Sequence, residues 1–218
     1  MSARPPEAGA EALTPEGFAE LVPVSRETLD RLVAYLDLLV LWQRTMNLVA
    51  ASTLADPWRR HVLDSAQLMA CWPEGAKVLV DLGSGAGFPG LVLAIMGAPE
   101  VHLIERDRRK AAFLREAARA TGCASVTVHA CGAGVAPAPK ADVVTARALA
   151  PLPDLLAHAT RFATPGTVCL FPKGRRVEAE LTDARRGWMM ELNQRPSLSD
   201  AEGQVLIISR FRRVGSNG

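Results

Sequence analysis

A short apolar segment followed by closely spaced glycines constrains the fold of this 218-residue chain more than any other feature. Residues 78–82 are apolar except for Asp81, and apolar residues resume at Leu91. Between them lie Gly83, Gly85, Gly87, Pro89 and Gly90. Glycine adopts positive φ and lets a ligand approach the backbone closely, and proline is favoured in the first turn of a helix. The pattern predicts a buried strand, a tight glycine turn and a helix.

Two kinds of cofactor loop fit these glycines. The spacing Gly85-x-Gly87-x-x-Gly90 matches the dinucleotide fingerprint, and Glu105 lies where an acid is expected to bind the ribose. That fingerprint opens directly from a strand, whereas further residues separate Gly85 from the strand here. The alternative spacing starts at Asp81 and uses the glycines at 83, 85 and 87. It resembles the S-adenosylmethionine loop of methyltransferases, with Glu105 at the ribose hydroxyls. An ordinary glycine turn in an α/β domain is the third interpretation.

Downstream of residue 77, apolar strand-like runs alternate with amphipathic runs of helix length. We expect strands at residues 77–82, 101–105, 126–129, 141–145 and 167–171, and helices at 89–97, 107–121, 152–163 and about 176–186. This alternation indicates a parallel sheet with helical crossovers. The last two apolar runs, at 188–192 and 205–209, have no helix-length segment between them. We therefore expect an α/β fold whose five parallel strands are followed by an antiparallel hairpin.

The residues before this sheet are expected to form a helical extension. Residues 1–24 are rich in Ala, Pro, Glu and Gly, and we expect a flexible N-terminus there. A cap at Ser25 and helical apolar spacing predict a helix over 26–42, and Pro57 predicts the start of a second helix that runs to residue 71. His61, Asp64 and Ser65 then share one helix face. The predicted division is a flexible segment 1–24, a helical cap 25–75 and an α/β domain 76–214.

Composition and charge limit the possible partners and compartment. The net charge is only +2, but basic residues cluster at 59–61, 106–110, 173–176, 185–186 and 210–213. A phosphate backbone responds to such local charge more than to the total. The four cysteines show no Cys-x-x-Cys spacing, which argues against a zinc site or a redox pair. No apolar run approaches the roughly 20 residues that span a bilayer, and no signal-peptide core is present. We expect a cytoplasmic protein without metal, and the sequence does not indicate an oligomeric state.

Five motifs occur in order along the chain, at residues 42–50, 60–65, 81–90, 146–150 and 171–174. The glycine loop alone is generic, whereas Arg60-His61-x-x-Asp64-Ser65 upstream and Phe171-Pro172-Lys173-Gly174 downstream make the combination specific. Over residues 30–210 the chain resembles the bacterial ribosomal RNA small subunit methyltransferase G family, also called glucose-inhibited division protein B. Members methylate N7 of a guanine in 16S ribosomal RNA with S-adenosylmethionine.

The resemblance implies a Rossmann-like class I S-adenosylmethionine-dependent methyltransferase fold. Its sheet is seven-stranded and mostly parallel, with an antiparallel C-terminal hairpin and an N-terminal helical extension. Residues 76–214 would be the methyltransferase domain, and the partner would be 16S ribosomal RNA or the small ribosomal subunit. The positions that match the family's cofactor site are Asp81, Gly83, Gly85, Phe88, Glu105, Gly132, Ala133 and Arg147.

One stretch departs from the family pattern. Relatives usually carry an arginine and an acid at the positions that read Cys131-Gly132-Ala133 here. The resemblance places Gly132 and Ala133 beside the adenine of the cofactor. In this chain backbone contacts to adenine can persist there, whereas charged side-chain contacts cannot. We therefore expect the departure to affect cofactor affinity and not the fold.

Methyl transfer to guanine N7 requires alignment more than acid–base catalysis, because N7 keeps its lone pair at neutral pH. The sequence agrees, since it shows no nucleophile triad, no Asn/Asp-Pro-Pro-aromatic tetrad and no Pro-Cys nucleophile. Lys173, at the end of the fifth expected strand, is our candidate for orienting guanine through O6, and phosphate or water is its alternative partner. His61 and Asp64 either close the pocket from the cap or form a hydrogen-bonded network that anchors the cap.

Two other functions are carried forward. A nicotinamide-dinucleotide-dependent oxidoreductase is disfavoured by the register of the glycines. It is also disfavoured because the single tyrosine, Tyr35, lies in the cap and cannot supply a Tyr-x-x-x-Lys pair. A non-catalytic RNA-binding scaffold is supported only by the departure at Cys131 and Ala133.

Overall fold

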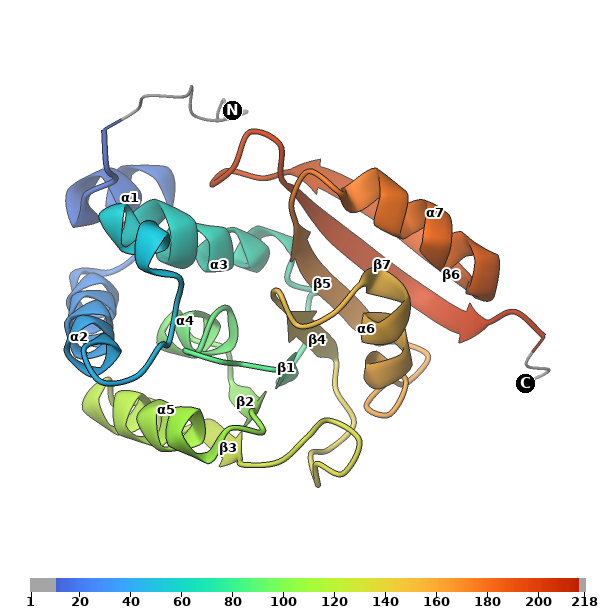
Figure 1. Cartoon of the computed structure of the whole chain (residues 1–218), viewed down its shortest axis with the longest axis horizontal. Helices are drawn as coiled ribbons and strands as arrows, with labels where there is room; N and C mark the ends of the chain where they lie inside the picture. The colour runs from blue at the N-terminus through green and yellow to red at the C-terminus, as the bar shows by residue number, and fades with distance from the viewer. Residues whose placement is uncertain (1–10, 216–218) are drawn as a thin grey trace.

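The computed structural model describes residues 11–215, and its centre is one mixed sheet (Figure 1). The strands in the described part of the chain are β1 Val78–Leu82, β2 Glu100–Ile104, β3 Val126–His129, β4 Val143–Ala146, β5 Val168–Lys173, β6 Trp188–Pro196 and β7 Gln204–Arg213. They form a seven-stranded sheet in the order β3-β2-β1-β4-β5-β7-β6. Strands β1 to β5 are parallel, and β7 pairs antiparallel with both β5 and β6. The predicted mostly parallel sheet with an antiparallel closing hairpin is confirmed.

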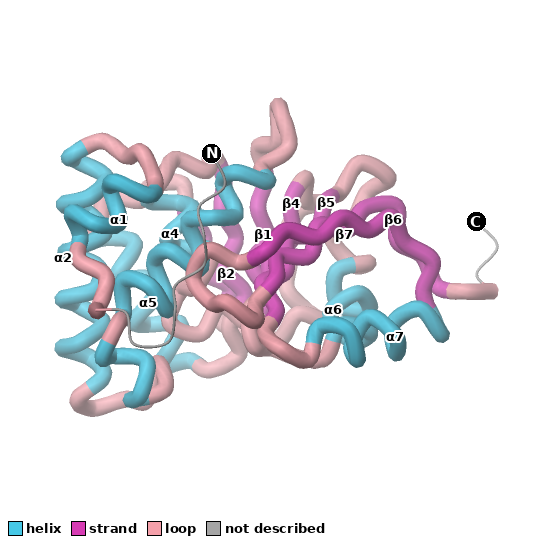
Figure 2. The backbone as a smooth tube through the Cα atoms, turned by 90° about the horizontal axis from the view of Figure 1, so that it is seen from above, coloured by secondary structure: helices cyan, strands magenta, loops and turns pink. Residues whose placement is uncertain are grey.

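Helices cover both faces of this sheet (Figure 2). They are α1 Pro15–Leu21, α2 Arg26–Gln43, η1 Ala51–Ala55, η2 Trp58–Leu63, α3 Asp64–Ala66, η3 Gln67–Cys71, α4 Gly90–Ile95, α5 Arg108–Ala120, α6 Leu152–Ala159 and α7 Val177–Gly187. Leu79 packs in the core formed with the cap, α4 and α5, whereas Val80 packs in the core formed with α6 and α7. The two cores follow from the alternation of side chains along a strand. Across residues 11–215, no helix has the length and apolar character needed to cross a bilayer.

The cap differs from the prediction in its second helix. Ser25 caps α2 by accepting from the Thr28 N–H, as its position predicts. Residues 58–71, in contrast, are not one α-helix but a π-helical turn, a short α-helical turn and a 3-10 turn in succession. A π turn has i→i+5 hydrogen bonds and is wider than an α turn. The spacing of His61, Asp64 and Ser65 is therefore not that of a regular α-helix face.

The N-terminal segment is more ordered than predicted from its composition. Residues 1–10 lie outside the described part of the chain. Residues 15–21, however, form helix α1, whose cap Thr14 accepts from the Gly17 N–H and whose first residue is Pro15. Phe18 is fully buried, and its ring centroid lies 5.4 Å from that of Trp58 in the cap. The expectation of a flexible segment over 1–24 is therefore wrong for these residues, because one buried aromatic anchors a helix that the surrounding polar residues conceal.

Gly90 allows α4 to pack directly on the sheet. A Cβ at this position would lie 2.5 Å from Cδ2 of Leu103 on β2 and 2.8 Å from Cβ of Asp81 on β1. Any side chain there would push α4 outward, since interiors are already close-packed. The last glycine of the motif thus serves helix–strand packing, and the glycines before it shape the loop.

Candidate cofactor and substrate site

The register of the central strands brings three predicted residues to one level at the carboxyl edge of the sheet. Leu82 of β1 is paired with Ile104 of β2 on one side and with Ala146 of β4 on the other. The next residues along these strands are Gly83, Glu105 and Arg147. Strand order reverses between β1 and β4, and open parallel sheets bind ligands beyond such a point. The register therefore places the candidate site at the switch point.

The glycine loop is partly exposed on one side and tightly packed on the other. Gly83, Gly85 and Gly87 have φ values of +64°, +56° and +97°, a region that costs other residues free energy. Gly83 and Gly85 are partly exposed, whereas residues 86–90 are buried. On the packed side, the Tyr35 hydroxyl of α2 donates a hydrogen bond to the Ala86 carbonyl. The cap thus fixes the shape of the loop from behind and leaves its first two glycines accessible.

Glu105 holds the same loop from the β2 side. Its Oε2 accepts from the Gly85 N–H and its Oε1 accepts from the Asp107 N–H, each at 2.8 Å. The Ser84 N–H donates to the carbonyl of Ile104 at 3.0 Å, which ties the loop to β2 a second time. A carboxylate has about four lone-pair sites, so two remain for further donors. Glu105 therefore both shapes the loop and keeps acceptor capacity at its edge.

Asp81 is buried beneath the loop. Its Oδ1 accepts from the Thr145 hydroxyl at 2.7 Å, and its Oδ2 has no hydrogen-bond partner among the described residues. Burial raises the pKa of Asp81 to about 6, although the hydrogen bond from Thr145 lowers it. The structure thus gives this predicted cofactor residue a supporting position between β1, β4 and Gly90, not a position on the exposed side of the loop.

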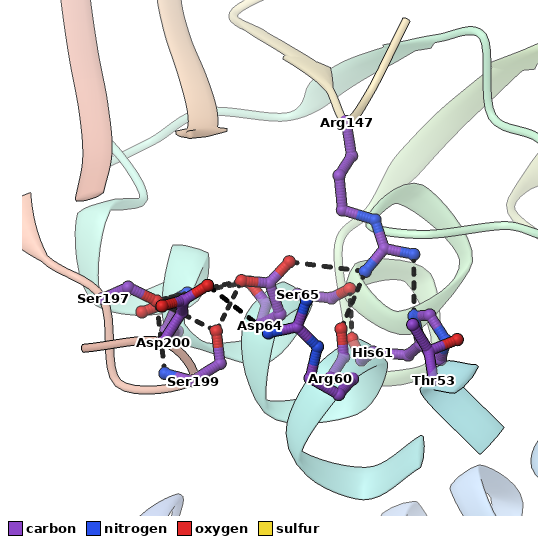
Figure 3. A network of polar contacts seen from close by, with 10 residues as sticks. Thr53, Arg60, His61, Asp64, Ser65, Arg147, Ser197, Ser199 and Asp200 are labelled. Carbon is purple, nitrogen blue, oxygen red and sulfur yellow. Dashed lines mark hydrogen bonds and ion pairs between the residues drawn. The ribbon is translucent and has the colours of Figure 1, made fainter. Parts of the chain in front are cut away.

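Arg147 extends from the end of β4 to the cap (Figure 3). Its Nη1 donates to the Arg60 carbonyl at 3.1 Å and to Asp64 Oδ2 at 3.3 Å, and its Nη2 donates to His61 Nδ1 at 3.0 Å. Its guanidinium carbon lies 4.9 Å from the centre of the Phe88 ring. These contacts use three of the five guanidinium N–H donors. Arg147 therefore joins the cap to the glycine loop and retains donors for a ligand.

His61 is locked as a neutral ring by this arginine. A guanidinium only donates, so Nδ1 must be the unprotonated acceptor and Nε2 must carry the hydrogen. Nε2 lies 2.8 Å from the Thr53 hydroxyl, which it can therefore only donate to. Burial and the neighbouring Arg147 lower the pKa of His61 to about 3. The ring also stacks on Phe88 at 4.7 Å between centroids. This predicted catalytic residue is an acceptor for Arg147 and not a general base.

Asp64 binds the arginine from the other side. Besides Arg147, it accepts at Oδ1 from the Ser199 hydroxyl at 2.6 Å and from Gln67 Nε2 at 3.2 Å. Both ring nitrogens of His61 have other partners, so the direct aspartate–histidine bond considered from their spacing is not formed. The structure supports the alternative interpretation, a polar network that anchors the cap, with Arg147 at its centre.

Lys173 lies at the other end of the segment that follows β4. Its ammonium donates to Glu180 Oε2 at 2.7 Å and to the Ala150 carbonyl at 3.2 Å, and its side chain is 10% exposed. Glu180 Oε2 also accepts from the Leu152 N–H at 2.9 Å. Neither phosphate nor water is thus needed to explain this lysine. It ties the segment 147–150 to α7, and one of its three N–H donors remains.

The remaining predicted residues lie in an exposed loop after β3. Gly132 is exposed and its carbonyl accepts from the Val135 N–H at 3.1 Å, whereas Cys131 and Ala133 are partly buried against the core beneath α6. All three follow the strand next to β2, so they lie on the Glu105 side of the site. No charged side chain replaces the family's arginine and acid within residues 131–133.

Sequence reasoning missed several residues of this region. Leu149 is 40% exposed, and its Cδ1 would lie 2.6 Å from a Cβ on Gly83, so it packs against the first glycine. Ser199 comes from the loop between β6 and β7, far from Asp64 in sequence. Glu180 carried only a weak signal, as an acid in the first turns of an expected helix. None of these contacts follows from local periodicity, because each depends on how distant segments pack.

These residues fit S-adenosylmethionine. The free lone pairs of Glu105 suit the ribose hydroxyls, and the exposed backbone at Gly83 and Gly85 admits a ligand without a Cβ in the way. Two N–H donors of Arg147 suit the carboxylate of the methionine part. Among residues 11–215, no three His, Cys, Asp or Glu side chains are grouped so as to hold a metal ion.

Comparisons with known proteins agree with this geometry. The family model described as rRNA small subunit methyltransferase G matches residues 28–206. A protein named ribosomal RNA small subunit methyltransferase G from Rhodospirillum centenum is 63% identical over 198 residues, covering 91% of this chain and 91% of that protein. Its namesake from Rhodospirillum rubrum is 54% identical and covers 93% of this chain and all of that protein.

Solved structures share the fold at low sequence identity. A SAM-dependent methyltransferase from Aquifex aeolicus superposes with a TM-score of 0.56 at 17% identity, over 72% of this chain and 95% of that one. The ribosomal protein L11 methylase from Lactobacillus delbrueckii gives 0.54 at 18% identity, over 68% and 76%. Because the family model and these relatives cover most of its length, the chain belongs to the rRNA small subunit methyltransferase G family of S-adenosylmethionine-dependent methyltransferases.

Proposed function

We propose that this protein transfers a methyl group from S-adenosylmethionine to N7 of a specific guanine in 16S ribosomal RNA. The observation that carries the proposal is the pairing of a cofactor-type edge with a lack of acid–base machinery among the described residues that meet there. Glu105 shapes an accessible glycine loop, whereas His61 is held neutral with both nitrogens engaged. Family membership supports ribosomal RNA as the substrate class and removes the oxidoreductase alternative.

The chemistry needs little from the protein beyond alignment. When bound, S-adenosylmethionine supplies an electrophilic methyl group on its sulfonium. The N7 lone pair forms the new bond to the methyl carbon while the carbon–sulfur bond breaks and its electrons go to sulfur, so no proton has to move. In such a reaction the reacting atoms must lie about 3–3.5 Å apart and in line. A site built from positioned backbone and clamps, with no free base, suits this requirement.

The cofactor roles that we propose follow the geometry. Glu105 accepts from the ribose hydroxyls, Gly83 and Gly85 give backbone access with Asp81 supporting the loop from below, and Phe88 packs beside the cofactor. Gly132 and Ala133 flank the adenine through their backbone. Arg147 closes the methionine end. His61 and Asp64 act by holding Arg147 in place, and neither transfers a proton.

We also propose that Lys173 orients the guanine through its remaining N–H donor, directed at O6. The alternative role is to hold Ala150 only. Two variants separate these roles, because Glu180→Gln weakens the ion pair and keeps the ammonium, whereas Lys173→Ala removes both. If Lys173 contacts the base, Lys173→Ala lowers the single-turnover methylation rate far more than Glu180→Gln, and cofactor affinity is unchanged in both. Equal effects of the two variants would remove Lys173 from the substrate role.

The basic clusters are proposed to bind the RNA backbone on either side of the site. Residues 106–110 follow β2 and residues 173–176 follow β5, so both lie at the same sheet edge as the glycine loop. We therefore expect RNA affinity to fall steeply with salt, since each neutralised phosphate releases counterions. An affinity that is independent of salt would contradict this interface. The proposal places the enzyme in the cytoplasm, with the small ribosomal subunit or its RNA.

One experiment tests the assignment as a whole. The purified protein is incubated with S-adenosylmethionine and 16S RNA or small subunits from cells that lack the gene, and the nucleosides are analysed by mass spectrometry. We expect 7-methylguanosine at one site in 16S RNA, and its loss with Arg147→Ala. Cofactor binding without any methylated nucleoside would favour an RNA-binding role over catalysis.

A further inference from the structure

The network around Arg147 does not end at Asp64. The loop between β6 and β7 carries Ser197 and Ser199, which are 4% and 5% exposed. Their hydroxyl oxygens lie 2.9 Å apart, and the Ser199 hydroxyl donates to Asp64 Oδ1 at 2.6 Å. Figure 3 shows these serines on one side of Asp64 and Arg147 on the other. A carboxylate of the cap thus lies between two segments that are far apart in sequence.

The direction of every bond in this chain is determined by chemistry. Asp64 only accepts and Arg147 only donates, so the Ser199 hydrogen must point to Asp64. Ser199 Oγ is then free to accept from Ser197 Oγ. Ser197 Oγ in turn accepts from the Ser199 N–H and lies 3.2 Å from Gln67 Nε2. The bonds therefore run from the loop to Asp64 on one side and from Arg147 to Asp64 on the other.

The loop is held against the cap by further contacts. The Leu198 N–H donates to Gln67 Oε1 at 2.8 Å, and Arg60 forms an ion pair with Asp200 at 3.4 Å. Only the hydroxyl of Ser199 reaches the carboxylate that binds Arg147. The other contacts can keep the loop in place when that hydroxyl is removed.

We propose that Ser199 is a positioning residue for Arg147 and hence for the cofactor. Its short bond fixes the rotation of the Asp64 carboxylate, so that Oδ2 faces Arg147 Nη1 and the guanidinium stays over Phe88. This role rests on the proposed contact between Arg147 and the cofactor. Ser199 itself touches neither cofactor nor RNA. Without its hydroxyl, Asp64 Oδ1 keeps only Gln67, and the carboxylate can turn away from the arginine.

Calorimetric titration with S-adenosylmethionine tests the proposal on the full chain. We expect Ser199→Ala to weaken cofactor binding by roughly tenfold, which corresponds to about 1.4 kcal/mol. Ser199→Thr keeps a hydroxyl and restores most of the affinity. Ser197→Ala is the matched control, because it removes a buried hydroxyl from the same loop and leaves the Ser199–Asp64 bond. A role in loop folding alone predicts equal effects for Ser197→Ala and Ser199→Ala, and that result would overturn the proposal.

A double-mutant cycle separates this proposal from the role of Arg147. If Ser199 acts through the arginine, Ser199→Ala has no further effect on cofactor affinity in an Arg147→Ala background. An unchanged tenfold effect in that background would overturn the positioning role. Unchanged affinity of Arg147→Ala itself would instead remove the proposed cofactor contact. If Ser199→Ala does not fold, the same cycle is measured with Ser199→Cys, whose weak donor predicts an intermediate loss.

Discussion

Substitution of Glu105 by glutamine is the sharpest perturbation of the glycine loop, because it changes two atoms and almost no volume. The carboxylate now accepts from the Gly85 and Asp107 N–H groups, each at 2.8 Å. An amide has one acceptor oxygen and one donor nitrogen. Whichever way it turns, one of the two backbone donors faces an NH₂ group and loses its partner.

The size of the effect can be estimated from these two bonds. A hydrogen bond to a charged group contributes about 1.5–3 kcal/mol, and the orphaned N–H adds a desolvation cost of about 1–3 kcal/mol if it stays buried. Partial exposure of Gly85 reduces the second contribution. We therefore expect Glu105→Gln to lower the free energy of unfolding by about 2 kcal/mol. We expect cofactor affinity to fall by about 10- to 100-fold, since each 1.4 kcal/mol is a factor of ten.

Urea unfolding and calorimetric titration with S-adenosylmethionine measure the two quantities on the same samples. Glu178→Gln, an exposed glutamate in the first turn of α7, is the matched control and should change neither. If Glu105→Gln bound the cofactor like the unchanged protein, Glu105 would neither shape the loop nor contact the ribose, and the assignment of this edge would be refuted.

Three further predictions concern packing and pH. Gly90→Ala should destabilise the protein by about 1–3 kcal/mol, since its Cβ would lie 2.5 Å from Leu103 Cδ2, and a normal urea midpoint would contradict the packing of α4. Tyr35→Phe should cost about 1–3 kcal/mol of unfolding free energy, because the buried Ala86 carbonyl loses its donor, and thermal unfolding measures this. His61 has a folded pKa of about 3 against an ordinary value near 6.5, so the unfolded chain takes up its proton first. Stability from this residue is therefore complete above pH ~6.5 and is lost as pH falls toward 3, and His61→Phe should flatten that slope in acid titrations. Between pH 6.5 and 8, cofactor affinity should show no step from His61.

The order of elements could be predicted well from the sequence, because each strand of the parallel sheet is a continuous apolar run between glycine or charged residues. Boundaries differ by a few residues, as for the helix expected at 152–163 and found at Leu152–Ala159. The segment 56–71 was predicted less well. Its apolar pattern is helical, and local periodicity does not distinguish an α turn from the π turn at Trp58–Leu63.

The site was predicted in part, for reasons that lie in the register. Gly83, Glu105 and Arg147 each follow a central strand, so parallel pairing brings them together. The direction of the Arg147 guanidinium could not be predicted, since it depends on the cap and on a loop about fifty residues downstream. The same holds for Lys173, whose partner Glu180 is apparent only once α7 packs beside the end of β5.

The most direct test of this account is the position of the transferred methyl group. The purified protein is given S-adenosylmethionine labelled in its methyl group together with unmethylated 16S RNA or small subunits, and the labelled nucleoside is identified by mass spectrometry. We predict that the label is recovered as 7-methylguanosine from a single site. Label on an exocyclic amine, a ring carbon or a ribose hydroxyl would contradict the account, because those atoms require a base or a nucleophile that the described site does not provide.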